Sequence, residues 1–558
     1  MTSTKKSCRN CSENFEITQE DKNFYDKISP VFSGKKYQIP EPSLCPDCRQ
    51  QRRLSFRNFV NLYNRECDLT GKKIISCYDT EINFPVYEQH EWWGDKWDQF
   101  QYGKEFDFSR SFFKQFQELY VKTPKMSVHN AQCENSDYCN FSYNSKNCYL
   151  VFGNINNEDC QFGHIVWKSE NCYDCVYTYQ SELCYESTDT VNCYDVSFSQ
   201  NVENCRNSHF LINCKNCVNC FGCTGLVNAK YYIFNKKYSQ EKYEEMLQQF
   251  NKGDFSLVET AKKRVNNLLS HDIVKNYHGL HNENISGDYI YFCKNTQKSY
   301  DTKNCEDSKF LVTVESFIDC YDCSFSPQKT EISYEGIFIS GYSILFSHNA
   351  IDCSNVIYSD NCFYCKNCFG CSSLKNAQYC IFNKQYTKEE YEKLVPKIIE
   401  HMQKTGEWGE FFPSEISPFA YNETVAQEYF PLTKKEVVEK GLNWKEEKKS
   451  QEYLGPKVEI PDDISDVTDE ICSKILQCEV TEKLYKITPQ ELQFYRKMNI
   501  PIPRKCPDQR HKERMALRNP RKLFERKCDN CSVKISTTYA PERPEKVFCE
   551  KCYLESVY

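Results

Sequence analysis

Short apolar runs separated by polar residues fill the middle of the chain. Between Cys139 and Cys214 they include CYLVF, QFGHIVW, CVYTY, CYDVSFS and SHFLIN. Each run is too short for a helix and is rich in β-branched and aromatic residues, which is typical of strands. Asn repeatedly precedes Cys, as at Asn147, Asn171 and Asn192, and Asn tolerates turn conformations. The pattern predicts a succession of short strands with Asn at the corners.

The cysteines of this stretch recur at regular intervals. From Cys139 they follow at 148, 160, 172, 175, 184, 193, 205 and 214. The main steps are 9 or 12, so equivalent positions return after 9 + 12 = 21 residues. A repeat of roughly 20–25 residues with short strands predicts a β-solenoid, in which like residues stack roughly 4.8 Å apart. Antiparallel meanders, or a string of small ribbons, are the alternatives that the pattern leaves open.

This array is duplicated. With an offset of 148, residues 214–247 align with residues 362–395 without gaps, and IFNK-x-Y and a predicted helix follow each copy. The second of these helices opens with the capping box Thr387-x-x-Glu390. The second copy has lost several cysteines, and Gly341 stands where Cys193 would be. We therefore expect two copies of one solenoid, called array 1 and array 2, each followed by helical segments.

Paired cysteines at each end of the chain have the spacing of metal ligands. Two residues between the cysteines of a pair let both thiolates turn toward one ion, and two pairs complete a tetrahedral site without an open position, the structural kind of zinc site. The sequence predicts about two such zinc sites, formed by Cys8, Cys11, Cys45 and Cys48 and by Cys528, Cys531, Cys549 and Cys552.

The two ends are copies of each other. Shifted by 461 positions, the run from Cys45 aligns with the run from Cys506. Upstream the offset is 470, so that residues 17–27 match residues 487–497 and Cys8 falls on Cys478. Each end is therefore a tandem of two ribbon units, numbered ribbons 1 and 2 at the front and ribbons 3 and 4 at the back. One ribbon of each pair has lost ligands: ribbon 2 has Cys67, Thr70, Glu88 and Glu91, and ribbon 3 has Cys478, Thr481, Cys506 and Gln509. We interpret both as decayed sites that keep their shape by packing; a weak metal site at the two carboxylates beside Cys67 is the alternative.

These motifs resemble a known kind of domain. The run CRNCSENFEITQEDKNFYDK…PSLCPDCRQQRR is similar to zinc-ribbon domains built as CxxC, an aromatic residue, a Phe-Tyr pair and CxxC-Arg. Most of the chain, through VYEQHEWWGDKWD, NCFGC…IFNKKYS and APERPEKVFCEKCY, further resembles uncharacterised multi-zinc-ribbon, cysteine-repeat proteins of candidate-phyla bacteria. The resemblance implies zinc binding and no established activity. Thr70, Glu88 and Glu91 depart from the paired-cysteine pattern.

Composition narrows the expected environment. The 36 cysteines stand beside only 6 methionines, aromatic residues make up 15%, and the formal net charge of −7 argues against a chain that is basic throughout. MTSTKKSCRNC has no apolar signal region, and no apolar run approaches membrane-spanning length. We expect a cytoplasmic protein without a membrane partner, whose reduced thiols bind metal or pack rather than form disulfides.

Two blocks place a cysteine at every third position. They are CKNCVNCFGC and CFYCKNCFGC, which contain Cys214, Cys217, Cys220, Cys223, Cys362, Cys365, Cys368 and Cys371. An iron–sulfur cluster is one interpretation, but the bacterial ferredoxin run ends in C-x3-C-P, which these blocks lack. Zinc or another thiophilic ion is the second interpretation. Packing inside a closing coil of each array is the one we favour, with these eight residues as the place to look for a further metal.

The basic stretch from Lys483 to Lys527 is the clearest partner signal. It includes Arg510, Arg514, Arg518, Arg521 and Lys522, and the whole stretch contains only four acidic residues. Basic side chains on a ribbon suit phosphate contact and base stacking, so nucleic acid is one predicted partner. A protein partner is equally favoured, and a solvated basic helix is the remaining alternative. The chain has no P-loop, GxGxxG, GxSxG or HExxH motif, so we predict no catalytic residues and identify no small-molecule substrate.

The predicted architecture is mainly β: two cysteine-rich, β-solenoid-like repeat arrays with helical inserts, flanked at both ends by tandem zinc ribbons. The predicted function is a non-enzymatic zinc-binding scaffold for protein or nucleic-acid partners; a redox or metal-cluster protein that uses the array thiols is the alternative. The predicted segments are ribbon 1 (1–66), ribbon 2 with an aromatic and helical segment (67–126), array 1 (127–235), a helical insert (236–290), array 2 (291–384), a helical segment (385–445), a charged linker (446–477), ribbon 3 (478–527) and ribbon 4 (528–558).

Overall fold

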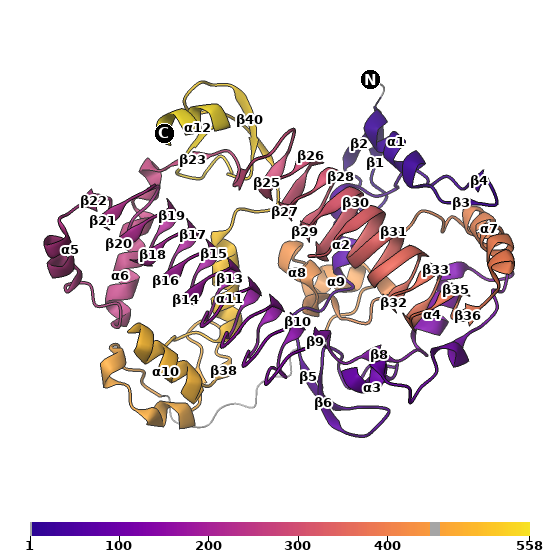
Figure 1. Ribbon diagram of the computed structural model, residues 1–558, viewed down its shortest axis with the longest axis horizontal. Coiled ribbons are helices and arrows are strands. Elements are labelled where there is room, and N and C mark those ends of the chain that lie inside the picture. Colours follow the sequence, from indigo (N-terminus) through magenta and orange to yellow (C-terminus); the bar gives the residue numbers. More distant parts are fainter. Residues whose placement is uncertain (1–2, 447–457, 558) are drawn as a thin grey trace. The chain divides into compact units, whose positions relative to one another are not determined.

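The computed structural model describes residues 3–446 and 458–557, so residues 447–457 of the predicted charged linker lie outside the described residues. The chain divides into two compact units. The first unit consists of residues 1–128, 277–445 and 521–523, and the second of residues 129–276, 446–520 and 524–558. Ribbons 1 and 2 therefore share a unit with array 2, and ribbons 3 and 4 share a unit with array 1 (Figure 1).

Array 1 is a β-solenoid of parallel strands. Each strand pairs with the strand one coil further along, for example Thr178 with Thr190 and Thr190 with Val202. One sheet contains β9 (Asn130–Ala131), β10 (Asn140–Tyr143), β11 (Phe152–Ile155), β12 (His164–Trp167), β13 (Val176–Tyr179), β15 (Thr188–Val191), β17 (Gln200–Glu203) and β19 (Ile212–Lys215). The other contains β14 (Glu182–Tyr185), β16 (Tyr194–Ser197), β18 (Arg206–His209), β20 (Val218–Phe221), β21 (Lys230–Ile233) and β22 (Lys236–Lys237).

The solenoid prediction is confirmed, but the predicted repeat length is wrong. The ladder step sets the length of one coil, and from Thr178 to Thr190 that step is 190 − 178 = 12. The cysteine spacing of 21 residues equals one full coil of 12 residues plus a further 9. This spacing suggested too long a repeat because cysteine occupies only some of the inward positions. The parallel pairing excludes the antiparallel meander for array 1.

Corners in the left-handed backbone region recur at every third residue. Asn213, Asn216 and Asn219 have φ of 55°, 52° and 53°, and the residue after each corner is buried in the coil. A 12-residue coil therefore has four three-residue sides. Asn is among the few residues that adopt this conformation at low cost, and its side chains stack along the corners: Asn192, Asn204 and Asn216 each donate an amide hydrogen bond to the Asn one coil later, at 2.6, 3.0 and 2.9 Å.

The inward positions form a narrow core of small residues. The buried core of array 1 contains cysteines and valines throughout. Cys214 Sγ donates to the Ile212 carbonyl at 3.4 Å and reaches the Cys223 carbonyl at 3.6 Å. Ser208 occupies the same kind of position, donating to the Arg206 carbonyl at 2.8 Å and accepting from the Cys220 N–H at 3.0 Å. Cys and Ser are thus suited to this core because each is small and can hydrogen-bond to the coil backbone.

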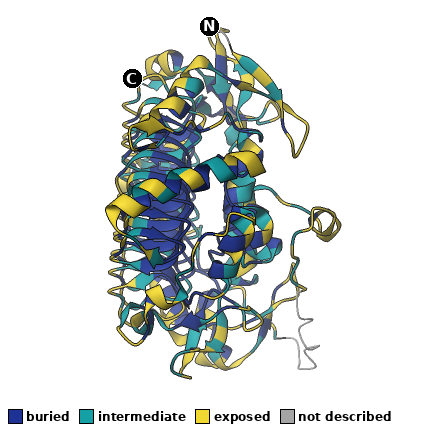
Figure 2. Cartoon of the chain, turned by 90° about the vertical axis from the view of Figure 1, so that its right-hand side faces the viewer, coloured by how far each residue is buried: buried dark blue, intermediate teal, exposed yellow. Residues whose placement is uncertain are grey.

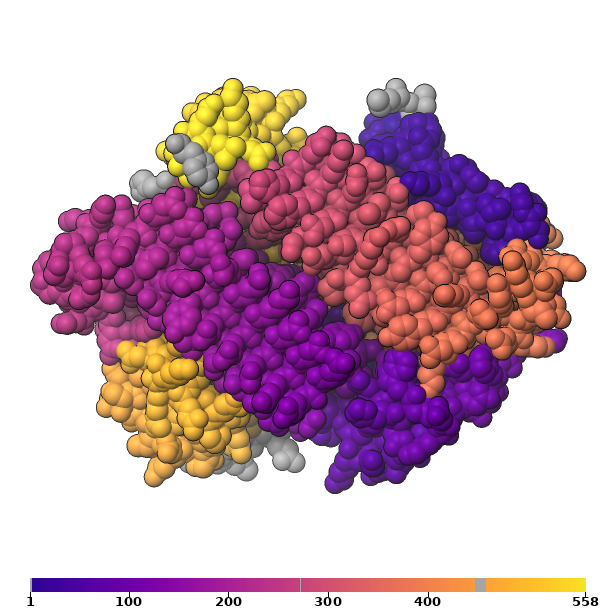
Figure 3. Space-filling view, viewed as in Figure 1, coloured from indigo at the N-terminus to yellow at the C-terminus, as the bar shows by residue number. Residues whose placement is uncertain are grey.

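Array 2 repeats this construction in the first unit. It begins at β24, within the predicted helical insert 236–290, because β24 and β25 are already part of the parallel ladder. Its strands are β24 (Gly279–Leu280), β25 (Gly287–Tyr291), β26 (Lys294–Gln297), β27 (Ser299–Lys303), β28 (Glu306–Lys309), β29 (Val312–Glu315), β30 (Phe317–Ser326), β31 (Thr330–Ile357), β32 (Asp360–Phe363), β33 (Lys366–Phe369), β34 (Ser372–Lys375), β35 (Gln378–Ile381) and β36 (Lys384–Gln385). Most pairs follow the same ladder step, as Gly287 with Ser299, but Phe317 pairs with Thr330, so this coil carries one extra residue. Figure 2 shows the buried strands of the arrays, and Figure 3 shows the coils of residues 129–235 stacked as a continuous band.

A hairpin and helices follow each array. In array 1 the antiparallel pair β21–β22 ends the parallel ladder, and α5 (Gln240–Leu247) and α6 (Phe255–Asn266) follow it. Their apolar side chains, among them Tyr243 and Val258, pack on Phe221 and Ile233. Array 2 ends in β35–β36 and α7 (Lys388–Thr405), whose Thr387–Glu390 capping box is present as predicted. The shorter elements after α7 are η3 (Ser414–Ile416), η4 (Tyr421–Glu423), α8 (Val425–Tyr429) and α9 (Lys434–Glu439).

All four ribbons are folded as hairpins joined to helices. Ribbon 1 contains β1 (Thr4–Ser7), β2 (Asn14–Ile17), α1 (Gln19–Ile28), β3 (Val31–Phe32), β4 (Lys35–Lys36) and α2 (Pro46–Leu54), and ribbon 2 contains β5 (Tyr63–Glu66), β6 (Lys73–Ser76), β7 (Val86–Tyr87) and α3 (Gln89–Trp93). Ribbon 2 therefore begins at β5, before its predicted start at residue 67, because β5 pairs with β6. Ribbon 3 contains β37 (Leu476–Gln477), β38 (Leu484–Tyr485), α10 (Pro489–Met498) and α11 (Pro507–Leu517), and ribbon 4 contains β39 (Phe524–Lys527), β40 (Lys534–Thr537), β41 (Lys546–Phe548) and α12 (Glu550–Val557). The first strands of both ribbons lie before the predicted starts at residues 478 and 528, because β37 pairs with β38 and β39 with β40.

The strand that precedes each array joins a ribbon. In the first unit β7 pairs in parallel with β8 (Lys125–Met126), which follows η1 (Gln99–Tyr102) and α4 (Phe112–Tyr120). In the second unit β41 pairs in parallel with β23 (Ile273–Lys275), which follows η2 (Leu269–His271). Val86 and Val547 are equivalent because 86 + 461 = 547, and they pair with Lys125 of β8 and Val274 of β23, so β8 and β23 are equivalent strands. Two short turns, η5 (Ile464–Asp466) and η6 (Asp469–Ser473), precede ribbon 3.

Candidate metal centres

Two groups of four cysteines have the geometry of metal ligands. They are Cys8, Cys11, Cys45 and Cys48 in ribbon 1, and Cys528, Cys531, Cys549 and Cys552 in ribbon 4; within each group all four Sγ atoms lie within 4.8 Å of one another. These are the two predicted ligand sets. Each group can hold a metal ion.

The first knuckle of ribbon 1 follows β1. The Cys8 N–H donates to the Glu13 carbonyl at 2.8 Å, and the Ser12 N–H donates to the Cys8 carbonyl at 2.9 Å. Ser12 adopts φ 63°, which closes the turn and carries Cys11 back toward Cys8. The turn thus brings two thiols to the same side of the hairpin.

The second knuckle lies at the start of α2. Cys45 is the N-cap residue, and Pro46 occupies the first turn of the helix, where a missing N–H costs nothing. The Cys45 N–H donates to Cys8 Sγ at 3.2 Å, and the Asn10 amide donates to Cys48 Sγ at 3.2 Å. Burial opposes ionisation of Cys8, but backbone hydrogen bonds from Cys11, Cys45 and Asn10 outweigh it and lower the pKa of this thiol to about 6. Cys8 therefore favours the thiolate, the form that binds metal, whereas the hydrogen bond with Cys48 and burial raise the pKa of Cys45.

Ribbon 4 repeats this arrangement. The Cys528 N–H donates to the Val533 carbonyl at 2.8 Å, Ser532 has φ 60°, and the Cys549 N–H donates to Cys528 Sγ at 3.2 Å. Burial again opposes ionisation, and backbone hydrogen bonds from Cys531, Cys549 and Asn530 lower the pKa of Cys528 to about 6. One cysteine of each site, Cys11 or Cys531, is exposed.

Ribbon 2 keeps the backbone of a site without its ligands. The Glu88 N–H donates to Cys67 Sγ at 3.2 Å, as the Cys45 N–H does to Cys8. The carboxylates have other partners: Glu88 caps α3 by accepting from the His90 N–H at 2.9 Å, and Glu91 pairs with Lys96 at 2.8 Å. The only groups of three or more possible ligands among the described residues are those of ribbons 1 and 4.

The cysteines of the two array blocks are coil positions. Cys214, Cys217, Cys220 and Cys223 are all completely buried and form the four inward positions of one coil; Cys362, Cys365, Cys368 and Cys371 do the same in array 2. Their thiols hydrogen-bond to backbone carbonyls, for example Cys365 Sγ to the Phe363 carbonyl at 3.4 Å. None of these eight residues belongs to a described ligand group, and the described cysteines form no disulfide.

The predicted basic surface of ribbon 3 is not formed by the arginines expected to line it. Arg510 and Arg514 are 3% and 4% exposed, and each lies 3.0 Å from Asp174 Oδ1 of array 1. Arg518 pairs with Asp189 at 3.0 Å, and Arg521, in the first unit, pairs with Asp301 at 2.8 Å. These side chains neutralise carboxylates of the arrays, and the sequence could not show this because the paired acids lie in a distant part of the chain.

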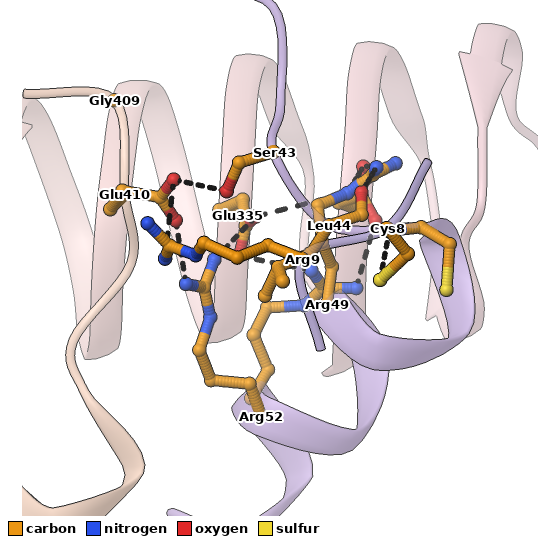
Figure 4. A network of polar contacts seen from close by, with 12 residues as sticks. Cys8, Arg9, Ser43, Leu44, Arg49, Arg52, Glu335, Gly409 and Glu410 are labelled. Atoms are coloured by element: carbon orange, nitrogen blue, oxygen red, sulfur yellow. Dashed lines mark hydrogen bonds and ion pairs between the residues drawn. The ribbon is translucent and has the colours of Figure 1, made fainter. Parts of the chain in front are cut away.

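Ribbon 1 makes the equivalent contacts with array 2. Because 49 + 461 = 510 and 174 + 148 = 322, Arg49 and Asp322 correspond to Arg510 and Asp174. Arg49 Nη2 lies 2.8 Å from Asp322 Oδ2, and Arg53 bridges Asp322 and Glu335, each at 3.1 Å (Figure 4 shows Arg49 and Glu335). All four side chains are at most 2% exposed. Sequence reasoning missed this network, although the two internal offsets carry the signal.

The metal ligands and the arginine network share one helix. Arg49 follows Cys48 directly in α2 and donates to the Leu44 carbonyl at 2.8 Å. Arg52 pairs with Glu410 at 2.8 Å and with Glu335 at 3.1 Å. Ser43, beside the second knuckle, donates to Glu410 at 2.6 Å, and Arg9 of the first knuckle lies 3.8 Å from it (Figure 4). Both knuckles of the candidate site therefore contact the network that joins ribbon 1 to the rest of the unit.

Aromatic stacking repeats the same correspondence. Phe24 of α1 stacks on Tyr321 of array 2 with ring centroids 3.7 Å apart. Phe494 of α10 stacks on Tyr173 of array 1 at 3.8 Å. Tyr173 and Tyr321 are again 148 positions apart, and Phe24 and Phe494 are the first members of the Phe-Tyr pairs noted in the ribbon motif. Each ribbon pair thus docks on its array by an aromatic stack and buried arginines.

Comparisons with known proteins identify no family. No protein-family model matches the chain, and no curated protein matches it. Among solved structures, a putative acetyltransferase from Desulfovibrio desulfuricans G20 aligns with 8% sequence identity over 42% of this chain and 64% of that chain, at a TM-score of 0.11. The alignment therefore spans less than two thirds of that structure. No helix in the described ranges 3–446 and 458–557 is both long enough and apolar enough to span a membrane.

Proposed function

We propose that the protein is a non-enzymatic scaffold in which zinc ions stabilise ribbons 1 and 4, and the two solenoid arrays provide extended surfaces for a protein partner. The observation that carries this proposal is the pair of closed four-cysteine groups. Four thiolates complete a tetrahedral zinc site and leave no position for a substrate or a reactive water, which is the character of structural sites.

The contacts of α2 support a role for the metal in docking. A metal held by Cys45 and Cys48 would fix the first turn of α2, which also contains Arg49. Arg49 and the neighbouring Arg53 enter a buried site lined by Asp322 and Glu335. Because leaving a buried charge unpaired costs about 3–5 kcal/mol, the helix has to be well ordered for these pairs to form. Zinc is thus proposed as the element that orders the ribbon for docking.

Nucleic-acid binding is not part of this proposal. The arginines that suggested it, Arg510, Arg514, Arg518 and Arg521, are paired with acids of the arrays. A redox or cluster function of the array thiols also lacks support, because these thiols are buried and hydrogen-bonded to the backbone. The identification of the ribbons with a named zinc-ribbon family stays a prediction.

Elemental analysis of protein purified without oxygen tests the proposal. We expect about two zinc ions per chain and no visible absorbance, with one zinc lost in Cys11→Ser and one lost in Cys531→Ser. Cys133→Ser, which changes a half-exposed cysteine outside both groups, is the matched control and should retain both ions. Iron with sulfide, or zinc content unaffected by both ligand substitutions, would contradict the proposal.

A further inference from the structure

Ribbon 3 keeps two ligand cysteines in the backbone geometry of the intact sites. The Cys478 N–H donates to the Lys483 carbonyl at 2.9 Å, and the Glu482 N–H donates to the Cys478 carbonyl at 3.0 Å. Glu482 has φ 59°, matching 63° at Ser12 in ribbon 1 and 60° at Ser532 in ribbon 4. The first knuckle of ribbon 3 therefore still has the shape that directs a thiol toward a metal.

The second retained cysteine is equally well placed. Cys506 is the N-cap residue of α11 with φ −65° and ψ 158°, and Cys45 is the N-cap residue of α2 with φ −64° and ψ 161°. The two knuckles are joined by the Glu479 N–H, which donates to the Arg504 carbonyl at 3.2 Å. Cys506 Sγ also lies 3.6 Å from the hydroxyl of Thr481, which belongs to the same knuckle as Cys478. Ribbon 2, by contrast, retains only Cys67.

The two remaining ligand positions do not complete a zinc site. Thr481 is exposed, and its hydroxyl lies 3.6 Å from Cys506 Sγ, where Cys11 Sγ lies 3.7 Å from Cys45 Sγ in ribbon 1. The Gln509 amide donates to Glu513 at 2.9 Å. Zinc in proteins is almost always four-coordinate in structural sites, so loss of two thiolates removes the basis for zinc binding and leaves a pair of thiols.

We propose that Cys478 and Cys506 form a two-thiolate site for a soft monovalent cation, with Cu(I) as its representative. Thiolates are the ligands that select Cu(I), and a closed-shell monovalent ion is satisfied by two sulfur atoms where zinc needs four ligands. Cys478 and Cys506 are 1% and 3% exposed, so the bound ion would be shielded from water, and the exposed Thr481 lies beside Cys506. The site is independent of the zinc proposed for ribbons 1 and 4.

Titration of the zinc-loaded, reduced full-length chain with Cu(I), buffered by bicinchoninate, tests the site. We expect one equivalent of Cu(I) to bind before any zinc is released, as followed by a zinc-sensitive dye, and we expect Cys478→Ser and Cys506→Ser each to abolish this uptake. Cys472→Ser, which changes a half-exposed cysteine just before ribbon 3, should bind as the unsubstituted chain does. Uptake that persists in both variants, or copper that binds only as zinc leaves, would overturn the proposal.

A gain of ligands provides a second test that does not depend on the stability of the serine variants. In Thr481→Cys/Gln509→Cys the four ligand positions of ribbon 3 again carry thiols, so the chain should bind one additional zinc ion. Cu(I) bound to the unsubstituted chain should show two sulfur neighbours by X-ray absorption. Failure of the double variant to gain zinc would show that the backbone of ribbon 3 does not hold ligand geometry and would refute the site.

Discussion

Equivalent residues in the two units make equivalent contacts with different arrays. Arg49 pairs with Asp322, Arg510 with Asp174, Phe24 stacks on Tyr321 and Phe494 stacks on Tyr173. The sequence indicates which ribbon residues correspond, because the two ends align with an offset of 470 at Phe24 and 461 at Arg49, but it does not indicate their partners. In the sequence, Arg514 and Arg53 look like parts of an exposed basic patch. In the structure, both pair with acidic residues of array coils that are distant in the sequence. At these positions the sequence indicates charge but not exposure.

The buried acid Asp322 is the residue on which the docking of ribbon 1 depends most. It faces Arg49 at 2.8 Å and Arg53 at 3.1 Å. Asp322→Asn should lower the free energy of unfolding of the first unit by about 3–5 kcal/mol, since two arginines are left in a buried site with one carboxylate. Asp319→Asn, whose partner Lys27 is half exposed, should change it by less than about 1 kcal/mol. Urea unfolding measures both; equal small effects would show that the network contributes little.

The inner cysteines should tolerate serine. The equivalent inward position of the other array is already a serine, because Cys160 of array 1 corresponds to Ser308 of array 2. Ser308 donates to the Glu306 carbonyl at 2.7 Å. Cys160→Ser should therefore cost less than about 2 kcal/mol of unfolding free energy. Cys160→Leu should cost more, about 1–3 kcal/mol or above, because the narrow core has no room for the larger side chain. Thermal unfolding distinguishes them, and a greater loss with Ser than with Leu would contradict a packing role.

At the scale of elements, local signals predicted more than long-range ones. The capping box at Thr387 and Glu390 and the cysteine knuckles at Cys8 and Cys528 are present because their hydrogen bonds involve residues a few positions apart. The predicted coil length is wrong, because only residue types are visible in the sequence and inward positions accept Cys, Ser, Val and Thr alike. The parallel ladder and its step emerge only when all inward positions are considered together.

The junction before β23 should give the second unit a pH dependence. Burial raises the pKa of Asp272 to about 6, against hydrogen bonds from Asn213 and Thr224 that lower it. A raised pKa means that the folded chain holds this proton more tightly than the unfolded chain does. The stability that this group contributes is therefore fully present below its unfolded pKa of roughly 3.9 and is lost as the pH rises through about 6. Asp272→Asn should therefore stabilise the second unit by about 1–3 kcal/mol at pH 7.5, with the difference shrinking toward pH 4. Urea unfolding at both pH values measures it; a stabilisation that does not change with pH would contradict this assignment.

At the scale of the molecule, the chain order and the spatial order differ. Each unit combines a ribbon pair with the array from the other half of the chain. The internal offsets of the sequence revealed the duplication. The strand pattern and the paired cysteines predicted a mainly β architecture with four-cysteine groups near both ends, which is what the structure has. The pairing of ribbons 1 and 2 with array 2 could not be predicted from the sequence. Both arrays carry the Asp and the Tyr that a ribbon contacts, and no local sequence feature selects one array over the other.

This order predicts the behaviour of a nicked chain. A protease site inserted between α5 and α6, near residue 251, would cut the chain into segments that both contribute to each unit. After cleavage the two fragments should remain associated on size-exclusion chromatography without denaturant, and they should separate only when the units unfold. Fragments that separate under native conditions would show that the ribbons do not depend on the array from the other half.

X-ray absorption at the zinc edge of the purified protein tests the central claim most directly. If ribbons 1 and 4 are closed structural sites, the spectrum should show four sulfur neighbours at about 2.3 Å and no nitrogen or oxygen neighbour. The same spectrum should persist at half the zinc content in Cys11→Ser, because ribbon 4 is then the remaining site. A coordination shell containing nitrogen or oxygen in the unsubstituted chain, or no bound zinc at all, would contradict the account.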